Sequence, residues 1–235
     1  MTAKVIATAN SKGGAGKTTM VFLLATVLAN RGMKVTVIDA DPNHPFALWE
    51  GQGGKTKNLS IVINENEETI LDDIEEAANQ SDFVIIDLEG TANLSVAYAI
   101  SRADLVIIPS QRSALDAAEA AKVIGLVKSQ SKVLGRDIPL ALILTRTSKA
   151  IRSKGLKRML ESLDTNKVDT FMVEVNEREA FKAVWDHART LEQLTSSQVS
   201  GLDKARANAE EFAVEVVKKL QGLQSSEADK LEGAA

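Results

Sequence analysis

The chain has 235 residues, of which 44% are hydrophobic, 26% charged and only 4% aromatic, a composition typical of a globular protein rather than a disordered one. It contains no cysteine, which excludes a disulfide scaffold, a thiolate zinc site, a cysteine nucleophile and a cysteine-ligated iron–sulfur cluster. The net charge of −4 argues against a protein that binds nucleic acid through an overall basic surface, although a local basic patch remains possible.

The N-terminus shows no signal-peptide pattern, and no apolar run is long enough to predict a transmembrane helix. We therefore expect a cytoplasmic protein. Short β-branched runs alternate with longer helical stretches, which predicts parallel strands joined by crossover helices. The expected strands cover residues 5–9, 34–39, 59–63, 83–88, 105–109, 139–145 and 170–175, and the expected helices cover 18–31, 68–79, 115–133, 152–163, 178–187 and 202–220.

This pattern predicts an α/β fold, a mostly parallel twisted sheet with helices on both faces. No change in composition marks a second domain. We expect one domain over residues 1–220 and a polar, frayed tail over 221–235, with a flexible surface loop at the glycines of 51–55.

A glycine-rich loop lies between the first expected strand and the first expected helix, with the sequence Ser-Lys-Gly-Gly-Ala-Gly-Lys-Thr-Thr. Backbone N–H groups of such a loop, with the helix N-terminus, bind phosphate oxygens. Lys17 is positioned in the motif to reach the β- and γ-phosphates, and the Thr18 hydroxyl to ligate Mg²⁺. The expected ATP-binding set is Lys12, Gly13, Gly14, Ala15, Gly16, Lys17, Thr18 and Thr19.

The loop departs from the standard phosphate-loop pattern because Ser11 replaces the first glycine and a second lysine, Lys12, follows it. The run from Lys12 to Thr19 resembles the deviant Walker A motif of the ParA/MinD class of P-loop ATPases, and the resemblance extends over nearly the whole chain. Short ParA-type partition ATPases, the ParF-like group, are the most similar. The resemblance implies an ATP-dependent homodimer in which Lys12 reaches the partner's nucleotide and, with Lys17, acts in catalysis.

Two carboxylate segments fit the same resemblance. The run Asp39-Ala40-Asp41-Pro42 resembles switch I, which implies that Asp41 orients the attacking water and contacts the Mg²⁺ shell, while Asp39 lies nearer Lys17. The run that ends in Asp87 resembles Walker B and implies a Mg²⁺ ligand. The residues that follow Asp87, Leu-Glu-Gly, depart from the family pattern, and we interpret Glu89 as a solvated turn residue.

Weaker likenesses suggest that residues 109–116 lie near the dimer face, that Arg146 flanks the adenine base, and that residues 177–181 and 189–191 close over the nucleotide. We interpret the isolated histidines and tryptophans as packing or partner-surface residues; they are His44, His187, Trp49 and Trp185.

Residues 146–158 carry six basic side chains and no acid, whereas residues 64–76 carry seven acids and no base. The basic run is similar in position to the nonspecific DNA-binding region of partition ATPases, while the acidic run is interpreted as a solvated helix face. Lys204 and Arg206 are further candidates for DNA contact. The expected DNA-binding residues are Arg152, Lys154, Lys157 and Arg158.

The resemblance thus implies a slow, partner-stimulated Mg²⁺-ATPase that segregates plasmid or chromosomal DNA with a small adaptor protein, at the nucleoid. An ATPase that positions a protein cargo, such as a chemoreceptor cluster or microcompartment, or that aids conjugative transfer, is the alternative. A metabolic P-loop ligase is disfavoured by Lys12, and a MinD-like membrane anchor by the acidic C-terminus.

Overall fold

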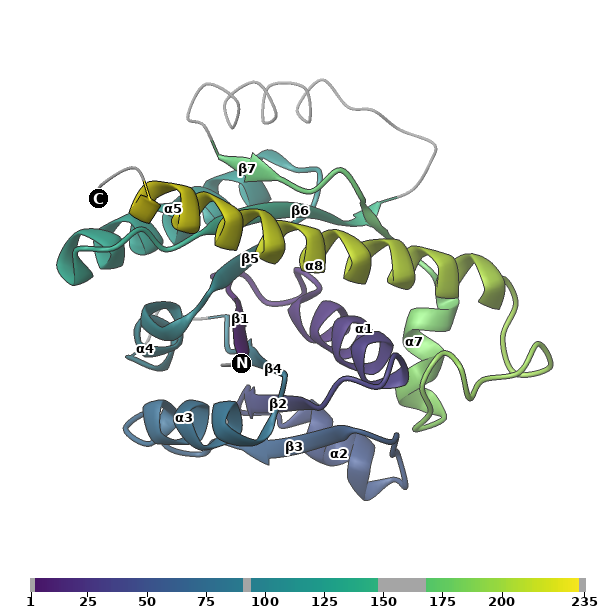
Figure 1. Cartoon of the computed structure of the whole chain (residues 1–235). Helices are drawn as coiled ribbons and strands as arrows, with labels where there is room; N and C mark the ends of the chain where they lie inside the picture. Colours follow the sequence, from purple (N-terminus) through teal and green to yellow (C-terminus); the bar gives the residue numbers. More distant parts are fainter. Residues whose placement is uncertain (1–2, 91–93, 148–167, 233–235) are drawn as a thin grey trace.

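The computed structural model describes residues 3–90, 94–147 and 168–232. Its strands pair in the order β3-β2-β4-β1-β5-β6-β7, with β8 beside β6, and every one of these pairings is parallel (Figure 1). The strands are β1 (Lys4–Thr8), β2 (Val35–Ala40), β3 (Leu59–Ile63), β4 (Phe83–Leu88), β5 (Leu105–Ser110), β6 (Leu140–Thr147), β7 (Asp169–Thr170) and β8 (Val175–Asn176).

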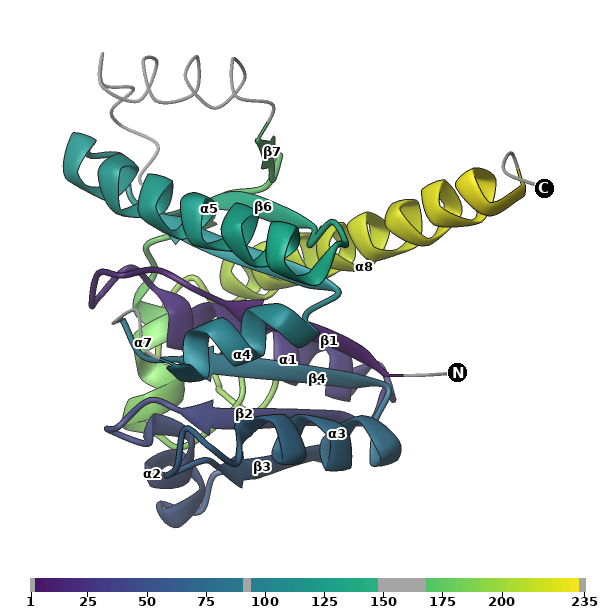
Figure 2. The same cartoon turned by 90° about the vertical axis from the view of Figure 1, so that its left-hand side faces the viewer.

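Helices cover both faces of the sheet, because the central strands are apolar on both sides. Side chains such as Ile6 and Ile85 pack under α1 (Lys17–Asn30), α2 (Pro45–Gly51), α7 (Glu179–Asp186) and α8 (Leu202–Glu232). Their neighbours, such as Val5 and Val84, pack under α3 (Ile70–Gln80), α4 (Leu94–Arg102) and α5 (Ala114–Leu134). Figure 2 shows these three helices from the side. The predicted fold class, a parallel sheet between two helical layers, is confirmed.

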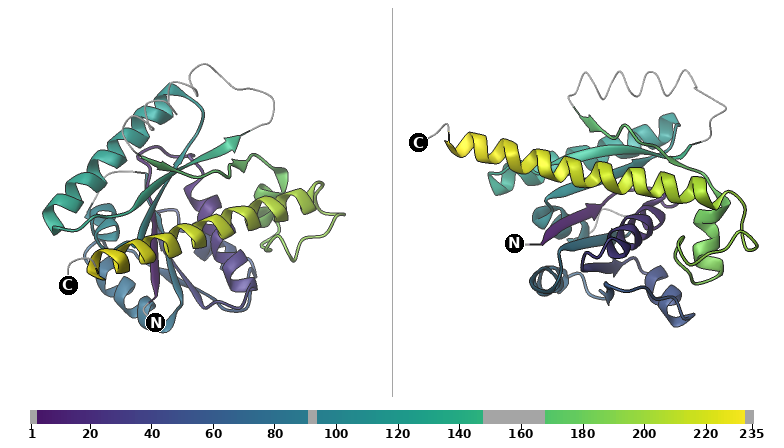
Figure 3. Two further views of the ribbon diagram at one scale, coloured as in Figure 1. Left: turned by 45° about the horizontal axis from the view of Figure 1, so that its top comes forward. Right: turned by 45° about the vertical axis from the view of Figure 1, so that its right-hand side comes forward.

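Helix α1 is apolar around almost its whole circumference, since it lies between the sheet and α8. Figure 3 shows α8 running past α1, with its C-terminal turns extending beyond the sheet. This double burial fixes α1, and with it the glycine-rich loop at its N-terminus. Because β1 lies in the middle of the sheet, that loop lies at the centre of the carboxyl edge, where open α/β sheets bind ligands.

Most predicted elements match the structure to within one or two residues, and β3 and β4 have the predicted bounds. Helices α2 and α4 were not predicted, and the single strand expected over 170–175 is replaced by the short strands β7 and β8. Helix α8 continues to Glu232, through a segment expected to fray. The helix expected over 152–163 lies outside the described residues.

The glycines expected in a flexible surface loop instead belong partly to the packed structure. Gly51 ends α2, and Gly54 is buried, where an added Cβ would lie 2.3 Å from the Trp49 ring. Trp49 contacts Phe22 of α1, with ring centroids 5.2 Å apart, and its indole N–H donates to the Val184 carbonyl of α7. The interpretation of Trp49 as a packing residue is thereby confirmed.

Candidate functional site

The glycine-rich loop passes from β1 into α1 through two left-handed residues. Gly14 has a φ of 75° and Gly16 a φ of 95°, a conformation that a residue with a side chain rarely adopts. Gly16 is the N-cap of α1, and its carbonyl accepts the first helical hydrogen bond, from Met20. The free N–H groups at this helix N-terminus make the loop suited to bind an anion.

Neighbouring strands and helices hold the loop from outside. The Thr145 hydroxyl, at the end of β6, donates to the Ala15 carbonyl at 2.7 Å, and the Gln111 amide donates to the Gly14 carbonyl at 3.0 Å. An added Cβ on Gly90 would lie 3.2 Å from the Gly13 nitrogen, so only a small residue allows this approach. Sequence reasoning missed these supports because they become neighbours only through the sheet order.

Lys17 lies inside the site, with 6% of its surface exposed and its ammonium 3.4 Å from the Asn10 carbonyl. Burial lowers the pKa of this lysine below 10.5, while the negative charges of Asp87, Asp41 and Glu89 oppose that shift. Glu89 is therefore near enough to act electrostatically on Lys17, while its interpretation as a solvated turn residue stays a prediction. A buried lysine among carboxylates at a helix N-terminus suits the binding of a strongly anionic ligand.

Lys12, the second lysine of the loop, makes a different contact. Its ammonium lies 2.8 Å from a carboxylate oxygen of Asp116 in the first turn of α5, and that side chain is only 2% exposed. Ser113 shares the Asp116 carboxylate, and the Ser11 hydroxyl donates to Glu119 one turn further along. In this chain on its own, Lys12 is thus held on α5 rather than directed into the glycine-rich loop.

Asp87, the penultimate residue of β4, is a fully buried carboxylate, and neither of its oxygens has a hydrogen-bond partner among the described residues. Burial raises the pKa of Asp87 from 3.8 to about 7, and the nearby Thr18 hydroxyl opposes only part of that rise. An uncompensated carboxylate inside a protein is costly unless a cation or donor meets it. The pairing of a carboxylate with a hydroxyl oxygen fits Mg²⁺, which prefers hard oxygen ligands and retains several waters.

The two carboxylates of the switch I segment have different surroundings. Asp41 is half-buried and accepts hydrogen bonds from the backbone and side-chain nitrogens of Asn43, at 2.9 and 2.8 Å. One oxygen of Asp39 accepts from the Phe46 nitrogen at 2.9 Å, at the start of α2, because this helix, which was not predicted, presents its free N–H groups to the carboxylate. The expectation that Asp39 lies nearer Lys17 stays a prediction.

Arg146 lies at the end of β6 with an exposed side chain and a φ of 49°, between Thr145, which supports the loop, and Thr147. Arg146 thus lies at the same edge of the sheet as the glycine-rich loop, and its contact with the adenine base stays a prediction. The predicted DNA-binding residues, Arg152, Lys154, Lys157 and Arg158, lie outside the described residues. Among the described residues no helix is long and apolar enough to cross a membrane.

Comparison with known proteins agrees with this geometry. The profile of the VirC1 protein family matches residues 3–227. Protein ParA of Rhizobium radiobacter is 37% identical over 216 residues, which cover 92% of this chain and 97% of that protein. The maintenance of carboxysome distribution protein A of Halothiobacillus neapolitanus is 26% identical over 161 residues, covering 67% of this chain and 74% of the relative.

Among solved structures, the ATP complex of a substituted form of Cyanothece McdA matches with a TM-score of 0.71 at 18% identity, covering 94% of this chain and 96% of that one. At that identity the match shows the fold alone. The family profile and the ParA relative, which extend over nearly the full length, go further: this chain belongs to the VirC1 protein family, within the ParA/MinD class of P-loop ATPases.

Proposed function

We propose that this chain is a Mg²⁺-ATP-dependent, dimerising ATPase that segregates DNA together with an adaptor protein. The observation that carries the proposal is the buried, unpartnered Asp87 carboxylate beside Thr18, at the mouth of a loop with free N–H groups and Lys17. This combination leaves a place for a cation and a phosphate chain, which a structural turn would not need.

Each residue then has a separate task. The loop from Gly13 to Thr19 and the Lys17 ammonium bind the phosphates, and Thr18 and Asp87 hold Mg²⁺, which would neutralise phosphate charge. Asp41, half-buried at the same sheet edge, orients the attacking water. Arg146 flanks the base.

Dimerisation gives Lys12 its task, since it would leave Asp116 and reach the partner's phosphates. Two exposed apolar side chains support a partner on this side of the molecule: Leu115, 60% exposed, is next to Asp116 at the start of α5, and Leu94, 56% exposed, starts α4. Burying them would help to offset the loss of the Lys12–Asp116 ion pair. Hydrolysis is therefore slow in a single chain and stimulated by a partner, because Lys12 acts as a catalytic group only on the nucleotide of the other protomer in the dimer.

For DNA contact, the proposal rests on the basic residues Arg152, Lys154, Lys157 and Arg158, which two copies would bring together in the dimer. The proposed location is the cytoplasm, at the nucleoid. DNA partition is supported by the name of a further relative, the chromosome partitioning protein ParA of Caulobacter vibrioides, which is 41% identical over 58 residues, 25% of this chain and 22% of that protein. A second candidate, positioning of a protein cargo, is supported by the carboxysome-distribution relative.

The first experiment measures molecular mass with ADP and with a non-hydrolysable ATP analogue; the dimer should form only with the analogue.

The second experiment measures the anisotropy of labelled random duplex DNA at several salt concentrations, with the protein bound to ADP and bound to the ATP analogue. If about six phosphates are neutralised per dimer, log affinity falls against log salt with a slope near −5. The double variant Arg152→Glu, Lys157→Glu should lose most DNA affinity and keep basal hydrolysis. DNA binding of equal strength in both nucleotide states, or none, would favour the protein cargo.

A further inference from the structure

Among the described strands, β3 is the last of the sheet at the end opposite β7, and no described strand pairs with its outer edge (Figure 1). The Val35 nitrogen donates to the Asn58 carbonyl and the Asn64 nitrogen donates to the Asp39 carbonyl, which fixes the alternation of this parallel ladder. Ser60 and Val62 therefore direct their backbone groups toward β2, whereas Leu59, Ile61 and Ile63 direct theirs outward. Three successive outward-facing positions form a template for another strand.

The sequence of this edge contains none of the features that normally protect one. Soluble proteins guard edge strands with lysine, proline, bulges or inward-pointing charges, since open edges pair with other chains. Strand β3 reads Leu-Ser-Ile-Val-Ile, with no charge, proline or glycine, and its register with β2 is regular from Leu59 to Ile63. The Ile63 side chain is 45% exposed. An edge of this kind fits a strand that receives a partner.

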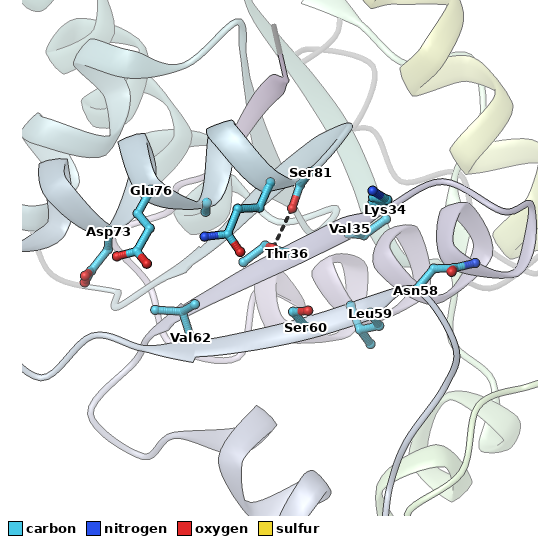
Figure 4. A pocket seen from close by; sticks show the side chains of 12 residues that line it. Lys34, Val35, Thr36, Asn58, Leu59, Ser60, Val62, Asp73, Glu76 and Ser81 are labelled. Carbon is cyan, nitrogen blue, oxygen red and sulfur yellow. Dashed lines mark hydrogen bonds between the residues drawn. The ribbon is translucent and has the colours of Figure 1, made fainter. Parts of the chain in front are cut away.

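A groove runs along this edge between β3 and α3, with a cavity volume of about 370 Å³ (Figure 4). Ser60 and Val62 form part of its floor, and Asp73 and Glu76 of α3 border one end, with Lys34 and Asn58 at the other. Thr36 and Ser81 are hydrogen-bonded to each other at 2.7 Å within it. A strand added to β3 would place every second side chain beside this groove.

The charge around the groove selects the occupant. Glu76 is exposed, makes no ion pair within the described part of the chain, and belongs to the run of seven acids without a base in residues 64–76. Lys34 is the only cation among the lining residues. A second copy of this chain would bring the same acidic run against its own, and nucleic acid would be repelled, whereas a basic peptide would be attracted.

We propose that β3 is a docking edge for an extended, basic segment of a partner protein, which adds to the sheet as a further strand. Its backbone pairs with Leu59, Ile61 and Ile63, and lysine or arginine at alternate positions faces Glu76 and Asp73 across the groove. Backbone pairing supplies affinity and the acidic groove supplies selectivity. This site lies away from the glycine-rich loop and requires no nucleotide.

The test uses the full chain without nucleotide and a labelled, end-capped peptide of alternating valine and lysine. Two matched probes accompany it: the same peptide with glutamate for lysine, and the same peptide N-methylated at alternate backbone positions, which keeps the side chains but blocks strand pairing. Binding is measured by anisotropy. Amide exchange is followed at Leu59, Ile61 and Ile63, with Ser60 and Val62 as internal controls.

The proposal predicts binding of the lysine peptide, at least about tenfold weaker binding of both matched probes, and slowed exchange at the three outward amides only. Glu76→Lys should weaken binding about tenfold, whereas Glu75→Lys, on the same helix but outside the groove, should change it less than about twofold. Equal binding of the N-methylated peptide, equal effects of the two variants, or protection elsewhere would overturn the proposal. So would protection of these amides in a concentrated, peptide-free sample of doubled mass, which would identify a second copy as the occupant.

Discussion

Two regions on either side of α2 differ in how their polar groups are satisfied. In the aromatic cluster of α1, α2 and α7, the Trp49 indole N–H donates to the Val184 carbonyl, and the Phe22 ring packs against the rings of Phe46, Trp49 and Trp185. At the carboxyl edge of the sheet, by contrast, both oxygens of Asp87 and one of Asp39 are buried without a partner in the part of the chain that the structure describes. The first region is complete in itself, whereas the second has its polar groups arranged for something that is not part of the chain.

This contrast indicates that the aromatic cluster stabilises the fold, whereas the carboxyl edge of the sheet serves to bind a ligand. The aromatic cluster holds α2 against α1 and α7, and α2 in turn binds Asp39, so the packed region fixes the start of switch I. The site region carries the cost of uncompensated charge, which a bound cation and phosphates would relieve. Substitutions in the two regions should therefore differ in sign and in readout.

The largest expected effect is on turnover. Asp41→Ala should lower ATP hydrolysis about 100- to 1,000-fold while leaving ATP affinity within a few-fold, because the carboxylate acts on the attacking water rather than on the bound phosphates. The measurement pairs steady-state hydrolysis with nucleotide titration. Asp87→Ala is the comparison, since loss of a Mg²⁺ ligand should weaken nucleotide binding as well. Equal loss of affinity in both variants would contradict the separate roles.

The two lysines of the loop should differ next. Lys17→Ala should weaken nucleotide binding more than about 100-fold, since it removes a buried charge-assisted contact to phosphate. Lys12→Ala should bind nucleotide nearly as well as the unchanged chain, because in the monomer Lys12 contacts Asp116 rather than the loop interior. It should nevertheless fail to dimerise with ATP, as light scattering would show. Normal dimerisation of Lys12→Ala would refute its proposed reach to the partner.

A substitution of Gly54 tests the packing of the aromatic cluster around α2. Gly54→Ala should destabilise the fold by about 2–3 kcal/mol, because its Cβ would overlap the Trp49 ring. Gly51→Ala, three positions earlier in the chain, meets no atom within 4 Å and should change stability by less than about 0.5 kcal/mol. Urea unfolding of both variants measures the difference. A stable Gly54→Ala protein would mean that α2 can move away from its place without cost.

The smallest expected effect is a gain in the free energy of unfolding, opposite in sign to the loss expected for Gly54→Ala. Asp87→Asn should stabilise the nucleotide-free chain at pH 8 by about 1–3 kcal/mol, since it removes a buried, unpartnered charge. Burial raises the pKa of Asp87 from 3.8 to about 7, so the folded chain holds a proton that the unfolded chain has lost. Its contribution to stability is therefore present below about pH 3.8 and is lost as the pH rises to about 7.

Thermal unfolding across that pH range should show a shallower decline for Asp87→Asn than for the unchanged chain. A residual slope should remain, because burial also raises the pKa of Asp39. The exposed substitution Asp137→Asn serves as the control and should leave the profile as it is. Destabilisation by Asp87→Asn at pH 8 would mean that the carboxylate has a partner in the unliganded protein.

The sequence by itself determined the glycine-rich loop, the sheet with helices on both faces, and the positions of Lys17, Asp41 and Asp87. These signals are local: a β-branched run, a glycine turn and a helical period each lie within a short stretch of chain. The bounds of β3 and β4 followed for the same reason. Helices α2 and α4 escaped prediction because they are short, with seven and nine residues. In α2 the apolar residues also serve tertiary contacts, such as that of Trp49 with Phe22.

Only the tertiary structure decided which distant groups meet. Thr145 supports Ala15 because β5 and β6 follow β1 in the sheet, and Asp116 receives Lys12 because α5 begins at the same sheet edge. Asp39 accepts a hydrogen bond from α2 because free N–H groups at a helix start bind a carboxylate. Sequence patterns predict the local conformation of a segment. These pairings depend instead on the order of the strands in the sheet, which brings residues more than a hundred positions apart into contact.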